Sequence, residues 1–484
     1  MNIQRASAEE IHRRTVCGEL DPIETAEIFS DSAQRSQANL NSFIALTPYL
    51  ALRSAEEVKS RLEKRESLGS LAGVPVAVKD NICLEGYPTT CASRILADFR
   101  PPYNATVVEK LIDAGALIIG KTNLDEFAMG STTESSYFGS AKNPLNSEYS
   151  PGGSSGGSAS AVASFHVAVA LGSDTGGSIR QPASLTGIVG LKPTYGAVSR
   201  YGLIAYASSF DQIGPFARNV RDTAMLYAAI AGRDRRDSTS VDNDTTNLMS
   251  AIDQFKPVRI GVPREYFGEG LDDDVGRAVG SALETAKSIG CEIVDLSMPI
   301  LDKAIAAYYV IATAEASSNL ARYDGVQFGQ RSPRAAAMQE MYSNTRSEGF
   351  GDEVKRRIML GTYVLSSGYY EEYYQKAMQV REIIRRDIMH AFDKADVIVT
   401  PTSPTAGIRL GEKIDNPLSM YLADVYTVIA NLTGTCAMSI PCGHGAFGLP
   451  IGVQVIGKHF DEMNLFRLAH RLESALDFRA GEDD

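Results

Sequence analysis

Two glycine- and serine-rich segments, joined by one short apolar run, constrain this chain more than any other feature of its sequence. The segments are residues 151–160 (PGGSSGGSAS) and 173–183 (SDTGGSIRQPA), and the run 161–171 lies between them. Glycine permits positive φ angles, so successive backbone N–H groups can point at one position, as a developing oxyanion requires. Flexible linkers are also rich in glycine and serine, but they rarely alternate with buried apolar runs. We therefore expect two tight turns that present Ser154 and Ser178 as candidate nucleophiles.

A lysine upstream of both turns is the candidate base. A serine hydroxyl is a weak nucleophile and needs a base within hydrogen-bond reach. The six histidines are scattered, and none has a recognisable catalytic context. Lys79 follows the strand-like run 74–78, so we expect it inside a sheet. Burial can lower the pKa of a lysine from about 10.4 towards 7–8, where the neutral base becomes available.

These segments resemble the amidase signature family of serine hydrolases. The matching motifs are residues 73–81 (GVPVAVKDN), 152–158 (GGSSGGS) and 174–183 (DTGGSIRQPA). The resemblance continues through residues 192–196, 210–215, 440–443 and 452–454, so it covers nearly the whole chain. Ser160, where alanine is usual in the family, is the one departure in the core motifs, and it lies past the catalytic turn.

The resemblance implies a Ser-Ser-Lys triad. Ser178 would be the nucleophile, and Ser154 would relay the proton between Ser178 and Lys79. Ser155, the neighbour of Ser154, would only form hydrogen bonds within its turn. The oxyanion hole would consist of the backbone N–H groups of Thr175, Gly176, Gly177 and Ser178.

Two other motifs compete with this interpretation. Residues 115–122 satisfy the P-loop pattern GxxxxGK[ST], but the residues between the glycines, Ala-Leu-Ile-Ile, look like a strand instead of a phosphate-binding loop. Residues 152–156 satisfy the GxSxG elbow of α/β-hydrolases, with His444 as the most tempting partner for Ser154. The elbow leaves Lys79 and the second glycine turn unexplained, so we favour the lysine mechanism.

Substrate choice is suggested by a second set of segments: residues 195–202, 314–320, 355–358 and 420–424. They resemble the family members that hydrolyse glutamine within a tRNA-dependent amidotransferase complex. Arg357 would hold the glutamine carboxylate and Asp424 its ammonium group, although Arg356 is an alternative to Arg357. Further contacts would come from Met129, Gly130, Ser131, Asp174 and Tyr309, with Tyr308 as an alternative to Tyr309. A small Gly-Ser pair at 130–131 would leave room for the scissile amide.

The same resemblance implies partners. A small subunit would wrap this chain, and a larger tRNA-binding subunit would use ATP and Mg²⁺ to amidate Glu-tRNA(Gln), Asp-tRNA(Asn) or both. The chain itself would need no cofactor or metal. One alternative is a stand-alone amidase of small amides. Another is an inactive binding module, but the intact lysine and both serines argue against that alternative.

Composition fits a large cytoplasmic enzyme. The net charge is −12 with no basic block, so the chain itself is not expected to bind nucleic acid. Six cysteines without a CxxC pair indicate neither zinc nor a disulfide framework. The N-terminus lacks the apolar core of a signal peptide, and the longest apolar stretch, near 161–171, is too short to span a membrane.

The pattern of apolar residues predicts an α/β protein with the amidase signature fold: a large mixed sheet flanked by helices on both faces. Helical spacing marks residues 7–17, 22–38 and 47–66, so residues 1–70 are expected to form a helical segment packed on the core. Residues 71–480 would form one catalytic domain. A mostly helical insertion near 298–382 would cover the site. The predicted strands are 74–78, 117–119, 167–171, 259–262, 292–294, 397–399 and 438–440, and further helices are expected at 107–114 and 274–289.

Overall fold

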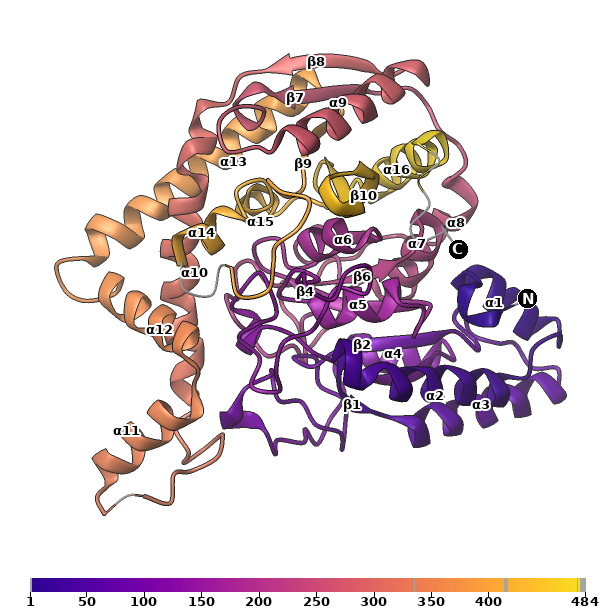
Figure 1. Cartoon of the computed structure of the whole chain (residues 1–484), viewed down its shortest axis with the longest axis horizontal. Helices are drawn as coiled ribbons and strands as arrows, with labels where there is room; N and C mark the ends of the chain where they lie inside the picture. Colours follow the sequence, from indigo (N-terminus) through magenta and orange to yellow (C-terminus); the bar gives the residue numbers. More distant parts are fainter. Residues whose placement is uncertain (1, 335, 413–416, 477, 479–484) are drawn as a thin grey trace.

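An eleven-stranded mixed sheet runs through the whole molecule, with the strand order β1-β3-β2-β4-β6-β5-β10-β11-β9-β7-β8 (Figure 1). The computed structural model describes residues 2–334, 336–412, 417–476 and 478. β2 pairs in parallel with β3 and β4, and β7 pairs in parallel with β8 and β9. The pairs between β4 and β11 in the strand order are antiparallel. The predicted large mixed sheet flanked by helices is confirmed.

The strands are β1 (Phe43–Leu46), β2 (Pro75–Lys79), β3 (Leu117–Thr122), β4 (Val169–Asp174), β5 (Val189–Lys192), β6 (Gln212–Ala217), β7 (Arg259–Pro263), β8 (Glu292–Leu296), β9 (Val397–Pro401), β10 (Ala437–His444) and β11 (Pro450–Ile456). All seven predicted strands are present, within a few residues of their expected ends. Four strands were not predicted: β1, β5, β6 and β11. Three of them contain glycine or proline, which interrupts the apolar pattern that identifies a strand.

The N-terminal seventy residues are not wholly helical. Helices α1 (Ala8–Val16), α2 (Pro22–Leu40) and α3 (Pro48–Glu63) occur where the spacing predicts them, but β1 lies between α2 and α3. β1 pairs antiparallel with β3 and forms one edge of the sheet. This strand has only four residues, Phe-Ile-Ala-Leu, and so short a run between two helices gives no periodic signal of its own.

Helices make up the regular structure of the described residues between β8 and β9. They are α10 (Ala304–Asn319), α11 (Met338–Gly349), α12 (Asp352–Val364) and α13 (Lys376–Lys394), with short 3₁₀ and π turns between them. In Figure 1 they form the arm along the left side of the molecule. The remaining helices are α4 (Thr106–Asp113), α5 (Gly156–Ala163), α6 (Arg180–Thr186), α7 (Val220–Ile230), α8 (Leu248–Ala251), α9 (Asp273–Ser288), α14 (Pro417–Leu422), α15 (Val428–Thr433) and α16 (Glu462–Leu476). None of the described helices combines the length and apolar character needed to cross a lipid bilayer.

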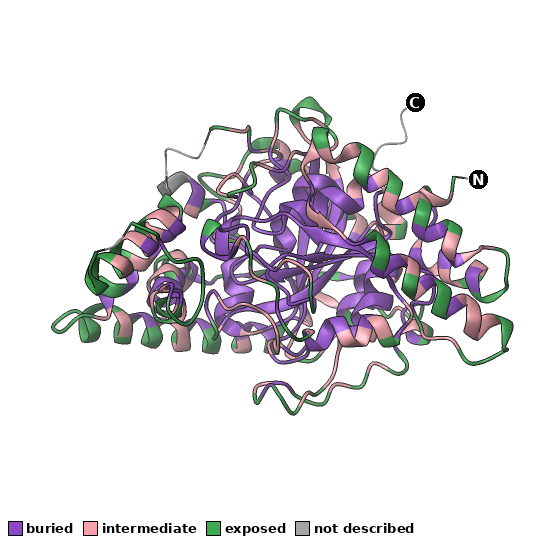
Figure 2. Cartoon of the chain, turned by 90° about the horizontal axis from the view of Figure 1, so that it is seen from below, coloured by how far each residue is buried: buried purple, intermediate pink, exposed green. Residues whose placement is uncertain are grey.

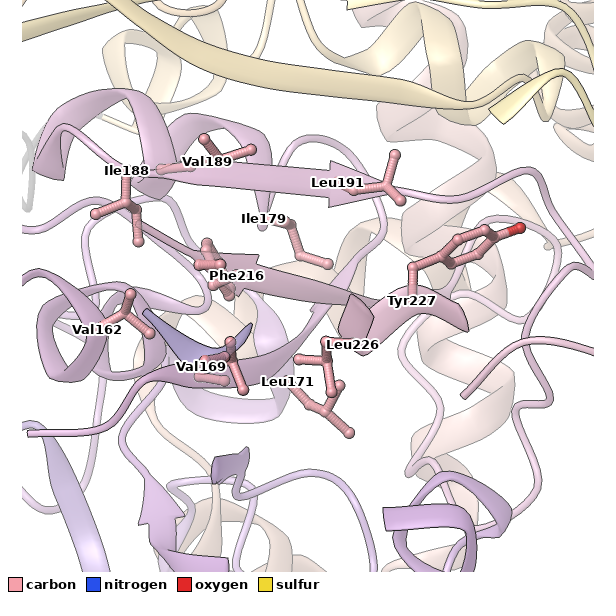
Figure 3. Close-up of a cluster of buried hydrophobic side chains, with 14 of the residues drawn as sticks. Val162, Val169, Leu171, Ile179, Ile188, Val189, Leu191, Phe216, Leu226 and Tyr227 are labelled. Atoms are coloured by element: carbon pink, nitrogen blue, oxygen red, sulfur yellow. The ribbon is translucent and has the colours of Figure 1, made fainter. Parts of the chain in front are cut away.

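The main core surrounds the centre of the sheet, where buried residues concentrate, while exposed residues lie on the outer helices (Figure 2). Figure 3 shows part of it: side chains of β4, β5 and β6 meet those of α5 and α7. Leu171 of β4, Phe216 of β6 and Leu226 of α7 are fully buried. Each such side chain contributes about 1.5–3 kcal/mol to folding. β2, which ends in Lys79, and β4, which precedes the Ser178 turn, are therefore anchored in this core.

Both glycine- and serine-rich turns lie beside the carboxyl ends of two parallel strands. Lys79 is the last residue of β2, and the second turn follows directly after Asp174, the last residue of β4. β2 and β4 pair in register, with Val78 opposite Leu171. The first turn leads into α5, which packs on β4. This edge of an open α/β sheet is where ligands commonly bind.

Candidate active site

Lys79 lies at the centre of the candidate site and is fully buried. Its Nζ is 2.8 Å from Ser154 Oγ, 2.7 Å from Ser155 Oγ and 3.0 Å from Ser173 Oγ. Burial lowers the pKa of Lys79 to about 7, although nearby carboxylates oppose the shift. A large fraction of this amine is therefore neutral near pH 7 and can accept a proton.

The two adjacent serines differ in how their hydroxyl groups are used. Ser155 Oγ also donates to the Ser173 carbonyl at 3.1 Å and so is held against β4. Within the described residues, Ser154 Oγ has Lys79 as its single hydrogen-bond partner. Ser154 can therefore give its proton to the lysine and accept another, as a relay requires. Ser155, expected to serve only its turn, is in addition a direct partner of Lys79.

Ser178 is more accessible than the groups that would activate it. Its exposed fraction is 8%, against 0% for Lys79 and for both serines of the first turn. The backbone joins the two turns, because the Ser155 N–H donates to the Ser178 carbonyl at 3.2 Å. Gly177 has φ +138°, which favours glycine, and a Cβ there would overlap the side chain of Thr427. The Ser178 turn therefore depends on a glycine at this position.

The four predicted oxyanion donors are not equivalent. The Gly177 N–H already donates to Asp174 Oδ1 at 2.9 Å. Within the described residues, the N–H groups of Thr175, Gly176 and Ser178 donate to no protein acceptor. These three groups are therefore free to stabilise an oxyanion, whereas Gly177 shapes the turn.

Asp174, predicted to contact substrate, is occupied by protein groups. Besides Gly177, its carboxylate accepts from Arg180 Nη2 at 2.9 Å, Arg180 Nε at 3.0 Å, Asn431 Nδ2 at 2.9 Å and the Ile179 N–H at 3.1 Å. Burial alone would raise the pKa of Asp174, but its pairing with Arg180 outweighs burial and lowers that pKa to about 2. The carboxylate thus stays charged and holds the turn in shape.

Arg180 connects this turn to the C-terminal part of the chain. Its Nη1 donates to the Thr427 carbonyl at 2.7 Å and to Gln454 Oε1 at 2.6 Å, and its Nη2 donates to Asn431 Oδ1 at 2.7 Å. The guanidinium is fully buried. A buried arginine with every side satisfied fixes its partners strongly, because leaving any of them unpaired would be costly.

A second cluster, the charged subsite, contains Arg357 and Asp424. Tyr309 lies between them: its hydroxyl donates to Asp424 Oδ2 at 2.8 Å, and its ring centroid is 5.4 Å from the Arg357 guanidinium carbon. Ser131 Oγ donates to Asp424 Oδ1 at 3.1 Å. Burial raises the pKa of Asp424 to about 6, although these hydroxyls and Arg357 oppose the shift. Near pH 7 Arg357 and Asp424 thus offer one cation and one carboxylate, and a second carboxylate, that of Glu353, is paired with Arg357.

The geometry separates the pairs of neighbours that the sequence leaves open. The side chain of Arg357 is 3% exposed and that of Arg356 is 40% exposed, although both pair with Glu353. Arg357 is therefore the residue that faces the cluster. Tyr309 contacts Asp424, whereas Tyr308 packs on the second turn, where a Cβ on Gly176 would lie 2.5 Å from its hydroxyl.

Tyr308 also shows that the two clusters are neighbours. Its ring meets the ring of Tyr309 edge to face, with centroids 4.9 Å apart. One side of the tyrosine pair thus touches the oxyanion turn and the other side contacts Asp424. The charged subsite and the turn that carries Ser178 are therefore adjacent.

The segment Met129, Gly130 and Ser131, predicted to form a wall of the substrate site, lies beside Asp424, which accepts a hydrogen bond from Ser131 Oγ. A Cβ on Gly130 would overlap the carboxyl group of Asp125, so glycine is needed there for packing against Asp125. The Ser131 carbonyl accepts from Gln181 Nε2 at 3.0 Å, and Gln181 Oε1 accepts from the Gly153 N–H at 2.9 Å. Gln181, which the sequence did not single out, therefore links this wall to the first turn.

The competing motifs do not form sites. Residues 117–122 are strand β3, and Lys121 is paired with Asp80 at 2.9 Å with both side chains fully buried, so this lysine cannot bind a phosphate group. His444 is exposed at the end of β10 and stacks on Phe478, with centroids 4.7 Å apart. Among the described residues, no group of three or more His, Cys, Asp or Glu side chains is arranged to hold a metal ion.

Comparison with known proteins agrees with this geometry. The family model described as Amidase matches residues 24–466, and the chain belongs to this family. It is 53% identical over 473 residues to the A subunit of the glutamyl-tRNA(Gln) amidotransferase from Gloeobacter violaceus, covering 98% of this chain and 97% of the relative. The relative of the same description from Geotalea daltonii is 52% identical over 479 residues, covering 99% of each chain. The crystal structure of the corresponding glutamyl-tRNA(Gln) amidotransferase polypeptide from Thermotoga maritima superimposes with a TM-score of 0.81 at 40% identity, covering 98% of this chain and 95% of that one.

Proposed function

We propose that this chain is the glutaminase subunit of a glutamyl-tRNA(Gln) amidotransferase. The observation that carries the proposal is the position of the charged subsite next to a buried lysine with two serine turns. Free glutamine has a carboxylate, an ammonium group and a side-chain amide, and Arg357, Asp424 and Ser178 offer one partner for each. The full-length similarity to polypeptides of glutamyl-tRNA(Gln) amidotransferases supports the same substrate.

The first half of the reaction forms an ester. Neutral Lys79 takes the proton of Ser154, which takes the proton of Ser178, and Ser178 Oγ bonds to the amide carbon of glutamine. The oxyanion that forms is held by the N–H groups of Thr175, Gly176 and Ser178. When the C–N bond breaks, the proton held by Lys79 returns through Ser154 to the leaving nitrogen. Ammonia departs, and a glutamyl ester remains on Ser178.

The second half uses the same groups, with water as the nucleophile in place of Ser178. A water molecule gives a proton through Ser154 to Lys79 while its oxygen attacks the ester carbon. The tetrahedral intermediate collapses, the proton returns to Ser178 Oγ, and glutamate leaves. Lys79 ends neutral, so one lysine serves both steps provided that its pKa stays near 7.

The charged subsite gives selectivity. The Arg357 guanidinium donates through Nε to Glu353 at 2.7 Å and through Nη1 to the hydroxyl of Tyr206 at 2.7 Å. The glutamine carboxylate would bind the remaining face of the guanidinium as a charge-assisted pair. The ammonium group would bind Asp424, whose position is fixed by the hydroxyls of Tyr309 and Ser131. A neutral amide without these two charges gains nothing from either residue.

The rest of the proposal concerns the complex. Ammonia would pass to a larger partner subunit that binds the tRNA and uses ATP and Mg²⁺ to amidate Glu-tRNA(Gln), Asp-tRNA(Asn) or both. A small subunit would wrap this chain. The chain itself would use no cofactor and would work in the cytoplasm. Its net charge of −12 fits a subunit that leaves tRNA binding to a partner.

Purification from the native source, followed by glutaminase assays, tests the proposal. Two associated subunits and a strong preference for glutamine over its decarboxylated analogue, 4-aminobutanamide, are expected. A monomer that hydrolyses both amides equally well would instead be a stand-alone amidase, and the proposal would fail.

A further inference from the structure

Glu126 is a buried carboxylate outside the reacting groups, and its contacts reach the helix that carries Arg357. Its exposed fraction is 3%. Oε2 accepts from the Gly351 N–H at 2.8 Å, and Oε1 accepts from the hydroxyl of Ser93. Gly351 is the N-cap residue of α12. The carboxylate thus satisfies one of the backbone N–H groups that the start of a helix leaves without a partner.

This contact sets where α12 begins. The Cα of Gly351 faces the carboxylate so closely that a Cβ there would lie 2.5 Å from Glu126 Oε2. Negative charge is also favourable at the N-terminus of a helix. Arg357 follows on the same 13-residue helix. Because a helix is stiff over so short a distance, a shift at Gly351 moves the Arg357 guanidinium with it.

The other side of Glu126 is tied to the catalytic half of the site. The Met129 N–H donates to the Glu126 carbonyl at 3.0 Å, at the start of the wall beside Asp424. The N–H of the preceding residue, Asp125, donates to the Ser154 carbonyl at 3.2 Å. Two consecutive residues therefore connect the proton-relay turn to the helix of the charged subsite.

We propose that Glu126 is a positioning residue that sets the distance between Arg357 and the Ser178 centre. This inference rests on the proposed function, because it assumes that Arg357 binds the glutamine carboxylate. Glu126 touches no reacting atom, so its loss should change glutamine binding and leave the nucleophile in place.

Glu126→Ala should therefore raise the glutamine KM by roughly 3- to 30-fold, the range usual for coupling through an intervening element. Labelling of Ser178 by a small uncharged acylating probe should continue at the wild-type rate. Burial raises the pKa of Glu126 to about 7, so the neutral amide of Glu126→Gln resembles one of its natural protonation states. Its amide oxygen can still accept from Gly351, and this variant should restore most of the affinity.

The matched control is Asp222, another buried carboxylate that accepts N–H groups at the start of a helix. Its oxygens are 2.8 Å from the Ala8 N–H and 3.0 Å from the Glu9 N–H of α1, and it has no contact with the site. Asp222→Ala should lower the melting temperature about as much as Glu126→Ala and leave the glutamine KM unchanged. If both variants changed KM equally, Glu126 would be an ordinary structural residue, and the inference would be wrong.

A double variant separates this inference from the proposed function. If Glu126 acts through Arg357, then Glu126→Ala combined with Arg357→Ala should raise KM no further than Arg357→Ala alone. Multiplied effects would contradict the inference while leaving the function intact. No effect of Arg357→Ala on KM would instead contradict the proposed glutamine site itself.

Gly351→Ala gives a second approach, because it should raise KM in the wild-type chain and be tolerated beside Glu126→Ala, where the added methyl group finds space.

Discussion

The reacting centre and the charged subsite are neighbours, but they are supported in different ways. Lys79 ends β2, and Ser178 lies in the turn that follows the neighbouring strand β4. A backbone hydrogen bond joins the two serine turns, and Arg180 ties the second turn to the C-terminal part of the chain. Arg357 comes from a helix outside the sheet, and Asp424 comes from the segment between α14 and α15. In the second case the side chains are held by a few hydroxyl and aromatic contacts. Under the proposed function, the reacting groups are held by the sheet and its turns, and substrate preference comes from elements outside the sheet.

This comparison predicts that variants of the reacting centre lower kcat, while variants of the charged subsite raise KM. The largest effect is expected for Ser178→Ala, which removes the nucleophile and should lower kcat on the order of 10⁶-fold. Mass spectrometry should find the glutamyl adduct on Ser178 in the wild-type chain and no adduct in the variant. An adduct on Ser154 would contradict the assignment of the nucleophile.

Lys79→Ala should have the next largest effect, a loss of roughly 10⁴-fold in kcat, because it removes the base from both half-reactions. The wild-type rate should also rise with pH through about 7, since Lys79 must be neutral and burial lowers its pKa to about that value. His444→Ala is the control and should leave kcat and its pH profile unchanged. A flat profile between pH 6 and 8 would show that another group is the base.

Arg357→Ala and Asp424→Ala should each raise the glutamine KM roughly 10- to 150-fold, because each loses a charge-assisted hydrogen bond of about 1.5–3 kcal/mol. Labelling of Ser178 by an uncharged acylating probe should persist in both variants. Arg356→Ala provides the comparison, since its side chain also pairs with Glu353 but is 40% exposed. Equal KM values in all three variants would place the glutamine charges elsewhere.

Ser155→Ala should have the smallest effect, roughly a 2- to 12-fold loss in kcat, because it removes one neutral hydrogen bond to Lys79. Ser164→Ala, at the other end of α5, is the control and should change nothing measurable in kcat. If Ser155→Ala were as damaging as Ser154→Ala, the relay would use both hydroxyl groups.

The candidate reacting centre could be proposed from the sequence because its motifs are local. Two glycines precede each of Ser154 and Ser178, and Lys79 ends an apolar run, so each motif can be recognised within a short segment. The hydrogen bonds of Lys79 to Ser173 and Ser155 could not be predicted from the sequence. Ser173 belongs to no recognised motif position, and Ser155 cannot be distinguished from its neighbour Ser154 by residue type. Ser155 and Ser154 differ only in the folded chain, where β4 lies beside β2 and the Ser173 carbonyl accepts from Ser155 Oγ.

The charged subsite could be named only through resemblance. Arg357, Tyr309 and Asp424 come from three separate segments, and nothing local distinguishes Arg357 from Arg356. The burial of one and the exposure of the other depend on how α12 packs. Gly130 is predicted to leave room for the scissile amide, and the structure adds a second reason for glycine, because a Cβ there would overlap Asp125. A residue pattern within one segment does not indicate contacts between segments that are far apart in the sequence.

Arg180 has a consequence for how the protein is made. The second turn lies near residue 178, and its arginine pairs locally with Asp174, but its other partners lie 247, 251 and 274 residues later in the chain. A ribosome adds residues at about 5–20 per second, so tens of seconds separate the synthesis of the nucleophile from that of its last support. Until Gln454 emerges and β11 joins the sheet, the guanidinium has Asp174 but lacks these later partners. A nascent chain therefore carries Lys79, Ser154 and Ser178 before the groups that complete the support of the second turn, and we expect it to hydrolyse amides only once those groups are in place.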